Sequence, residues 1–212
     1  MAETARKQDD TIGLATVYGV RGSEEAEAFY DRWAAGYDAE VADSGYVTPE
    51  RCADALARFA QDKAAPLMDL ACGTGLSGIA LRRAGFACID GFDLSEGMLE
   101  KAREARVYRH LATADLSQPL DIAEAVYANA AAVGCVSPEY MPPTVLDEVM
   151  GKLPPGGCFV FSVNDHAAED GTIVGRINEL VDCCYADLMF SEYGDHLPSI
   201  GLGATVYVLR RR

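Results

Sequence analysis

The sequence predicts an α/β fold with a doubly wound, mostly parallel sheet, and three observations carry this prediction. A short apolar run over 65–70 ends beside an acidic residue, a glycine turn follows, and 76–84 has the pattern of a helix. A second apolar run ends in the same way at Asp93, and strand-like and helix-like segments alternate from there on. Such alternation is typical of parallel sheets covered by helices on both faces. The last two strand-like segments are separated only by a loop, which predicts an antiparallel hairpin at one edge.

The N-terminal part of the chain predicts helices that precede the sheet. Phe29, Trp33 and Tyr37 recur at four-residue intervals, which places them on one face of a helix. We expect Phe29 and Trp33 to pack into the core, whereas the hydroxyl of Tyr37 needs a polar partner when it is buried. At 212 residues the chain is expected to form a single domain. Its expected parts are a loosely held lead-in, a helical cap and the sheet, at 1–22, 23–62 and 63–212.

The remaining elements follow from hydrophobic periodicity and from turn residues. Pro49 suits the first turn of a second cap helix, and Ser95 suits the N-cap of a later one. The expected helices are 23–45, 49–60, 76–84, 96–105, 142–152 and 172–185. The expected strands are 65–70, 87–92, 107–112, 125–132, 158–163, 187–193 and 204–209.

Composition narrows the classes of partner. The net charge of −15 and a pI near 4.5 argue against nucleic acid and against an anionic membrane surface. The first ten residues lack the apolar core of a signal peptide, and no run reaches the ~18 apolar residues of a membrane span. The seven cysteines include no Cys-x-x-Cys pair, so we expect neither a disulfide framework nor a metal site. A reducing, cytoplasmic setting fits this composition best.

The turn after the first strand has the features of a site for an adenosine-bearing cofactor. Gly73 and Gly75 have no Cβ, so a ligand can approach the backbone, and the helix start behind them presents free N–H groups. Asp93 follows Gly75 by eighteen residues, about the spacing at which an acid reaches a ribose diol.

Taken together, these motifs resemble the class I S-adenosylmethionine (SAM)-dependent methyltransferases. The resemblance rests on DLACGTG at 69–75, GFDLSEGML at 91–99, ADL at 114–116 and LPPGG at 153–157. It implies a Rossmann-like sheet of seven strands in the order 3-2-1-4-5-7-6. The N-terminal helices and Gly45-Tyr46 are similar to the small bacterial methyltransferases related to the one encoded in the Williams–Beuren syndrome region.

The resemblance also implies residue roles in binding SAM and its product S-adenosylhomocysteine (SAH). Asp69 would hold the ammonium group, and Asp93 would accept hydrogen bonds from both ribose hydroxyls. Asp115 would accept from the adenine amino group, and the Leu116 N–H would reach a ring nitrogen. The other implied cofactor residues are Ala71, Gly73, Thr74 and Gly75 in the turn, Leu94 and Met98 beside adenine, Ala130 and Ala131 beyond the fourth strand, and Tyr37 and Tyr46 from the cap.

Two alternatives stand beside methyl transfer. The stretch 73–78, GTGLSG, matches the dinucleotide fingerprint, and an NAD-dependent oxidoreductase would use Asp93 in the same way. Against this, Asp69 interrupts the strand where an NAD fold has apolar residues, and a carboxylate does not favour a nearby pyrophosphate. A SAM-binding sensor or partner subunit without catalysis is the second alternative. A pocket that opens beyond the cofactor would favour the enzyme.

The acceptor side is less specific in sequence. We expect acceptor-side residues from the N-terminal cap and from the loops after the fourth and fifth strands, where open α/β sheets bind ligands. These loops contain Glu139, Tyr140, Asn164, Asp165 and His166. His166 and Tyr140 are the catalytic candidates, although His166 also fits a surface turn. We expect His110 in or beside the third strand, away from the methyl group, and His196 in the loop before the last strand, from which it could approach the substrate mouth. The composition favours a small uncharged or cationic acceptor, and it leaves the methylated atom and the oligomeric state open.

Overall fold

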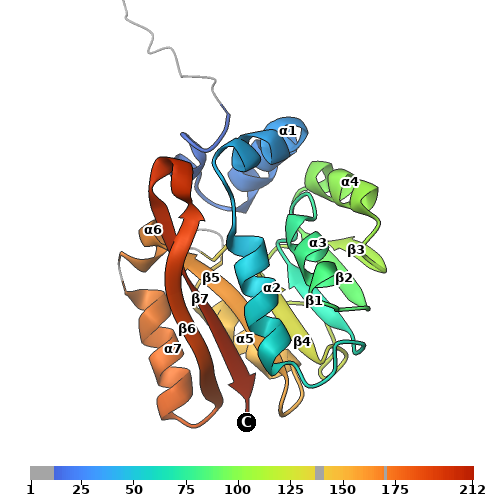
Figure 1. Ribbon diagram of the computed structural model, residues 1–212, viewed down its shortest axis with the longest axis vertical. Helices are drawn as coiled ribbons and strands as arrows, with labels where there is room; N and C mark the ends of the chain where they lie inside the picture. Colours follow the sequence, from blue (N-terminus) through green and yellow to red (C-terminus); the bar gives the residue numbers. More distant parts are fainter. Residues whose placement is uncertain (1–11, 137–140, 170) are drawn as a thin grey trace, which may run out of the picture.

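The computed structural model describes residues 12–136, 141–169 and 171–212. Their strands form one seven-stranded sheet (Figure 1). The strand order is β3-β2-β1-β4-β5-β7-β6, as predicted. β1 to β5 run parallel, whereas β7 runs antiparallel to both β5 and β6. The strand bounds are β1 Leu67–Leu70, β2 Ile89–Asp93, β3 His110–Thr113, β4 Asn129–Ala132, β5 Cys158–Asn164, β6 Ala186–Leu197 and β7 Leu202–Arg211.

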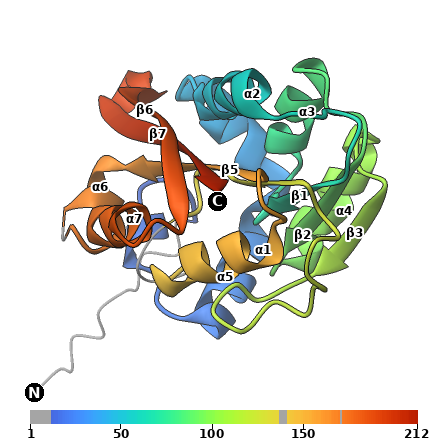
Figure 2. The same cartoon turned by 90° about the horizontal axis from the view of Figure 1, so that it is seen from below.

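Helices cover both faces of the sheet, as Figure 2 shows. On one face α2 and α3 pack through residues such as Leu56 and Leu81, and on the other α5 and α7 pack through Val149 and Ile177. The helix bounds are η1 Val17–Gly19, α1 Ser23–Asp43, α2 Thr48–Phe59, α3 Leu76–Arg83, α4 Glu96–Ala105, α5 Thr144–Lys152, α6 Asp165–Ala168, α7 Thr172–Asp182 and η2 Pro198–Ile200. None of these helices is long and apolar enough to span a bilayer.

The strands divide the core between the two faces. In β1, Leu67 packs toward α2 and α3, while Met68 and Leu70 belong to the cluster on the opposite face. All three are fully buried, as are Phe159 and Phe161 on β5. Because both faces are covered, the central strands are mostly apolar and almost completely buried. Burial of each large side chain contributes about 1.5–3 kcal/mol.

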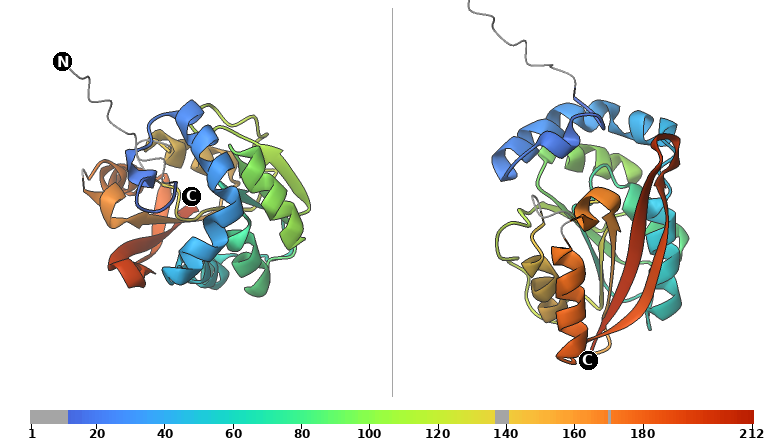
Figure 3. Two further views of the ribbon diagram at one scale, coloured as in Figure 1. Left: turned by 90° about the horizontal axis from the view of Figure 1, so that it is seen from above. Right: turned by 90° about the vertical axis from the view of Figure 1, so that its left-hand side faces the viewer.

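α1 lies across the end of the molecule at which the parallel strands finish (Figure 3). Asp31 joins it to α4, because its Oδ1 atom accepts from the Ser95 hydroxyl at 2.5 Å and from Gly97 N at 3.0 Å. Ser95 caps α4 by accepting from Met98 N at 3.0 Å, as predicted. The position of α1 leaves the carboxyl ends of the strands covered by an aromatic helix.

Several predicted boundaries were wrong. The expected cap included α2, but α2 lies on the sheet face, so the cap consists of α1 and the segment before it. That segment, expected to be a loosely held lead-in, contains buried Val17 and Val20. β4 is shorter than the predicted strand 125–132, and β6 is longer than the predicted strand 187–193.

Candidate functional site

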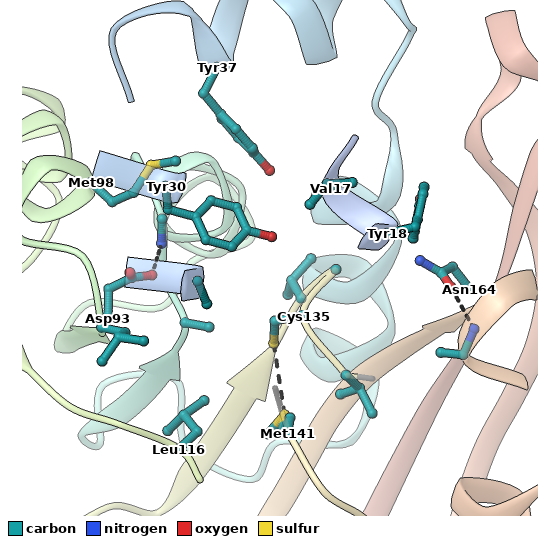
Figure 4. Close-up of a pocket in the computed structure, with 18 of the residues that line it drawn as sticks. Val17, Tyr18, Tyr30, Tyr37, Asp93, Met98, Leu116, Cys135, Met141 and Asn164 are labelled. Carbon is teal, nitrogen blue, oxygen red and sulfur yellow. Dashed lines mark hydrogen bonds between the residues drawn. The ribbon is translucent and has the colours of Figure 1, made fainter. Parts of the chain in front are cut away.

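A cavity of about 480 Å³ lies between the carboxyl ends of the strands and the α1 cap. Its volume is in the range of small-molecule binding sites. Figure 4 shows Asp93 and Met98 on one side, Tyr18 and Asn164 on the opposite side, and Tyr37 descending from the cap between them. The turns after β1, β2 and β3 form the first side, and the segments after β4 and β5 and the end of β6 form the second.

The turn after β1 places Gly73 on the cavity wall. Its φ is +55°, and an added Cβ would meet no atom within 4 Å, so the backbone faces open space there. Ala71 also lines the cavity. Thr74 and Gly75 do not: the Thr74 hydroxyl donates to Asp38 at 2.5 Å, and Gly75 packs against Tyr108 as the N-cap of α3. The turn therefore combines one exposed glycine with two residues that hold it in place.

Asp93 ends β2 and lines the cavity next to that turn. Its Oδ2 accepts from Gly73 N at 2.8 Å, and its Oδ1 accepts from Ser95 N at 2.9 Å. Burial raises the pKa of this carboxyl group, although the backbone hydrogen bonds oppose the shift. Each carboxylate oxygen can accept more than one hydrogen bond, so Asp93 is fixed in orientation and keeps capacity for a ligand.

Asp69 is completely buried in β1 and is not part of the cavity wall. Its Oδ2 accepts from the Ser77 hydroxyl at 2.7 Å and from the Tyr108 hydroxyl at 2.8 Å. Its Oδ1 is sealed from solvent and has no hydrogen-bond partner among the described residues. Burial raises the pKa of Asp69 to about 7. A buried acceptor without a partner is unfavourable, and a donor brought by a ligand would relieve it.

The side of the cavity near β3 contains the four residues expected beside adenine, namely Leu94, Met98, Asp115 and Leu116. Met98 is buried, and Asp115 is fixed by hydrogen bonds that its Oδ1 accepts from the Ser23 hydroxyl at 3.1 Å and from Ser117 N at 2.8 Å. The structure thus brings these side chains to one wall, together with Asp93.

The prediction for the fourth strand needs a correction. Ala130 and Ala131 lie inside β4, where they are fully buried in the two core clusters, and neither lines the cavity. The predicted strand 125–132 ends at the residue where β4 ends, so the error was to expect Ala130 and Ala131 beyond the strand and not inside it. The residues that follow β4 and do line the cavity are Val133, Gly134, Cys135 and Val136.

The cap supplies the roof. Tyr37 lines the cavity, and burial raises its pKa, so its hydroxyl stays protonated. Trp33 is buried beside it and donates from Nε1 to Glu40 Oε2 at 2.7 Å. The other oxygen of Glu40 accepts from Leu14 N at 2.9 Å. Glu40 therefore joins α1 to the segment 12–22, which contributes Tyr18 and other residues to the cavity.

The candidates after β5 differ in position. Asn164 lines the cavity and caps α6, since its Oδ1 accepts from Ala167 N at 2.9 Å. His166 also lines it, but is exposed at the rim, with its ring 4.3 Å from that of Tyr18. Asp165 does not line it, because its carboxylate accepts from Gly203 N at 2.8 Å instead. Glu139 and Tyr140 lie outside the described residues.

Of the remaining histidines, His110 lies on β3 as expected, away from the cavity. His196 was expected in a loop, but it belongs to β6, is 5% exposed and lines the cavity. Its Nδ1 lies 2.7 Å from the Thr48 hydroxyl. No local alternation marks it, because β6 pairs with β7 through register shifts, one of them between Asp195 and Leu197.

Comparison with known proteins places this geometry in a family. A family model described as a methyltransferase domain matches residues 67–157, the segment from β1 to the start of β5. Residues 67–157 are a methyltransferase domain, and the sheet has the class I fold. The human Methyltransferase-like protein 27 is 34% identical over 146 residues, which are 68% of this chain and 60% of that protein. The chain thus spans less than two thirds of the length of this relative.

Solved structures share the methyltransferase domain fold. One belongs to the complex between the Haloferax volcanii Trm112 methyltransferase activator and a methyltransferase, with a TM-score of 0.67 and 19% identity over 88% of this chain and 98% of that one. Another is an S-adenosylmethionine dependent methyltransferase from Mesorhizobium loti, with a TM-score of 0.55 and 19% identity over 73% and 95% of the two chains. At these identities the likeness concerns the fold.

SAM is the cofactor of this methyltransferase class, and the residues around the cavity are compatible with it. The open space beside Gly73 admits a ligand along the backbone, and the Asp93 carboxylate stands at its edge. The buried carboxyl group of Asp69 lies outside the cavity wall, and when ionised its charge favours a cationic group nearby. In the described part of the chain, no group of three or more metal-ligating side chains is present.

Proposed function

We propose that this protein is a SAM-dependent methyltransferase that acts on a small molecule. One observation carries the proposal: the cavity continues from the wall of Gly73, Asp93 and Asp115 to the wall of Asn164 and His196. The first wall contains residues that we expect to bind the cofactor, and the second leaves room for an acceptor. A protein that only sensed SAM would not need this second half, so the continuous cavity favours the enzyme over the sensor.

In the proposed complex, Asp93 would accept from the ribose hydroxyls, Asp115 and the Leu116 backbone would bind adenine, and Asp69 would balance the ammonium charge. Tyr37 would close the site from the cap, and Tyr46 from the loop between α1 and α2. SAM, when bound, would supply a methyl group on a sulfonium: the acceptor atom would bond to the methyl carbon, the carbon–sulfur electron pair would stay on sulfur, and the acceptor's proton would pass to solvent. The chain itself aligns the acceptor and excludes water, mainly through the aromatic roof.

The oxidoreductase alternative depends on the same turn and predicts a different ligand. An NAD pyrophosphate would lie against the start of α3, close to the turn that follows β1 and Asp69. A buried carboxyl group there is unfavourable for a diphosphate and favourable for an ammonium group. The seven unpaired cysteines support a reducing compartment for either activity, and we propose the cytoplasm.

Calorimetric titration tests the proposal directly. The full chain should bind SAM and SAH but not NAD, and Asp93→Ala should weaken SAH binding by about tenfold to a hundredfold, the loss expected for charged hydrogen bonds. Asp90→Ala is the matched control, because Asp90 is a buried carboxylate at the other end of β2 that bonds Arg109 and Tyr127 away from the cavity. Binding of NAD alone would overturn the proposal and support the oxidoreductase.

A further inference from the structure

Two side chains from distant parts of the chain meet over the carboxyl end of β4. Gly134 follows this strand, lines the cavity and has a φ of +71°. A Cβ at this position would lie 2.3 Å from the Tyr46 hydroxyl and 3.8 Å from Cε1 of His196. The Gly134 N–H donates to the Ser162 hydroxyl at 2.8 Å, which fixes the turn. A glycine here therefore lets both side chains approach the backbone at the second wall of the cavity.

His196 is held in one orientation. Its Nδ1 lies 2.7 Å from the hydroxyl of Thr48, which is completely buried at the start of α2. Its backbone carbonyl accepts from Val47 N at 3.2 Å, and its ring stands edge-on to Tyr46 with 5.2 Å between centroids. Since Thr48 occupies Nδ1, Nε2 is the ring nitrogen that remains for a ligand. Nε2 makes no hydrogen bond within the described residues, and it is not sealed by them.

The two groups are uncharged at neutral pH. Burial lowers the pKa of His196 to about 4, with Arg51 adding to the shift and Asp165 opposing it. Burial raises the pKa of Tyr46 well above its usual value. The Tyr46 hydroxyl also makes no hydrogen bond within the described part of the chain. Both groups can exchange hydrogen bonds with a ligand, and neither offers it a charge.

The rest of the cavity offers little to an anion. Among the described residues that line it, Arg21 is the one lysine or arginine, and its guanidinium donates to the Tyr18 and Val20 carbonyls at 2.9 Å each. Around the end of β4 the walls are Val136, Met141 and Leu197. Transfer of a carboxylate into such surroundings without a cationic partner is strongly unfavourable.

We propose that Tyr46 and Nε2 of His196 form the subsite that binds the nucleophilic group of an uncharged acceptor carrying an O–H or N–H. The proposal rests on the methyltransferase function and names the acceptor class of the same cavity. The apolar walls take the body of the acceptor, and the two polar groups orient its protic atom at the end of β4. His196 is a binding and positioning residue in this assignment, and the rim residue His166 is not required.

Three probes of similar shape test which charge of acceptor the subsite prefers: the neutral benzyl alcohol, the cationic benzylamine and the anionic benzoate. The full chain contains three histidines, so ¹⁵N-histidine labelling gives few signals, and His196→Gln assigns the one of interest. In the SAH complex, benzyl alcohol should shift the Nε2 resonance of His196 and bind about tenfold tighter than the other two probes. His196→Gln should lose this preference and keep its affinity for SAH. His110→Gln, changed on β3 outside the cavity, should keep both.

The outcomes are distinct. Tighter binding of benzoate or benzylamine, binding of none of the three probes, or binding of benzyl alcohol without a shift at His196 would each overturn the subsite. If the chain failed to bind SAH at all, the methyltransferase proposal itself would fail, and this one with it. Binding of SAH with an unchanged probe preference in His196→Gln would refute the subsite alone.

Discussion

A single buried carboxyl group, Asp69, connects the stability of the fold to pH. Its pKa is about 7 in the folded chain, because burial raises it, and lies near 3.8 in an unfolded one. Between these values the folded state keeps a proton that the unfolded state has lost, so stability falls as pH rises toward 7. Asp69→Asn mimics the protonated group. We expect its melting temperature, relative to the natural chain, to rise between pH 5 and 7 and then to level off.

Asp90→Asn provides the comparison with the opposite sign. Burial raises the pKa of Asp90, but hydrogen bonds from Arg109 and Tyr127 outweigh this and lower the pKa overall. Its contribution to stability is therefore present above the unfolded pKa and lost in acid. Differential scanning fluorimetry across pH measures both variants. Equal pH slopes for Asp69→Asn and the natural chain would contradict the assignment of a raised pKa.

Residues whose placement depends on local pattern were predictable, and those placed by distant contacts were not. Gly73 and Asp93 lie in a strand–turn–helix unit whose spacing alone brings them together. His196 reaches the cavity through its contact with Thr48, a residue 148 positions away. Tyr18 lies in a short segment without helical or strand periodicity, which is ordered by the packing of Val17 and Val20 against α1 and by the hydrogen bond from Leu14 N to Glu40.

At the scale of elements, the cap depends on a joint at Glu40. Its two oxygens accept from Trp33 Nε1 and from Leu14 N, which fastens the segment 12–22 to α1 above the cavity. We expect Glu40→Ala to speed SAH dissociation by about tenfold, since each hydrogen bond to a charged group contributes about 1.5–3 kcal/mol. Trp33 is the single tryptophan, so stopped-flow fluorescence reports directly from the roof.

The control for this experiment is Glu27→Ala, which removes an exposed carboxylate from the same helix. Glu40→Gln should fall between the two, because an amide oxygen can replace one carboxylate oxygen as acceptor but its NH₂ group cannot replace the other. Identical dissociation rates for Glu40→Ala and Glu27→Ala would mean that the joint does not hold the roof closed.

The turn after β4 tests how closely the elements meet there. Gly134 and Gly201 have nearly the same φ, +71° and +70°, but only Gly134 has atoms in the space of a Cβ. Gly201→Ala should cost about 1–2 kcal/mol of unfolding free energy from the left-handed backbone alone. Gly134→Ala should cost about 1–3 kcal/mol more, because Tyr46 has to move. Urea denaturation measures the unfolding free energy of both variants. Equal losses of unfolding free energy would show that the Tyr46 side chain can move aside without cost.

The errors in element assignment have a common physical cause. The amphipathic pattern of α2 predicts that Cys52 and Leu56 are buried, but it does not predict which surface they pack against. A helix before the first strand can cap the sheet or cover its face, and only tertiary packing decides. In β6, the polar residues Asp195 and His196 made the strand look finished, although pairing with β7 continues to Leu197.

At the scale of the whole molecule, the strand order of the sheet determines where the cavity lies. Strand order and crossover connections could be predicted, because alternating strands and helices allow few arrangements. β1, β2 and β3 lie on one side of β4 and present the turns expected to bind the cofactor. β5, β7 and β6 lie on the other side and present the second wall. The two halves of the proposed site thus meet at the carboxyl end of β4, just before Gly134.

The overall charge gives a last prediction for the molecule as a whole. With 33 acidic and 18 basic side chains, the folded chain repels itself, and described ion pairs such as Arg103–Glu96 are half exposed and contribute little. Raising NaCl from about 20 to about 500 mM shortens the screening length several-fold, so the melting temperature should rise. Sucrose of equal osmolality is the uncharged control. A fall in melting temperature with salt would mean that attractive pairs, including Arg109–Asp90 and Arg210–Asp187, outweigh the repulsion.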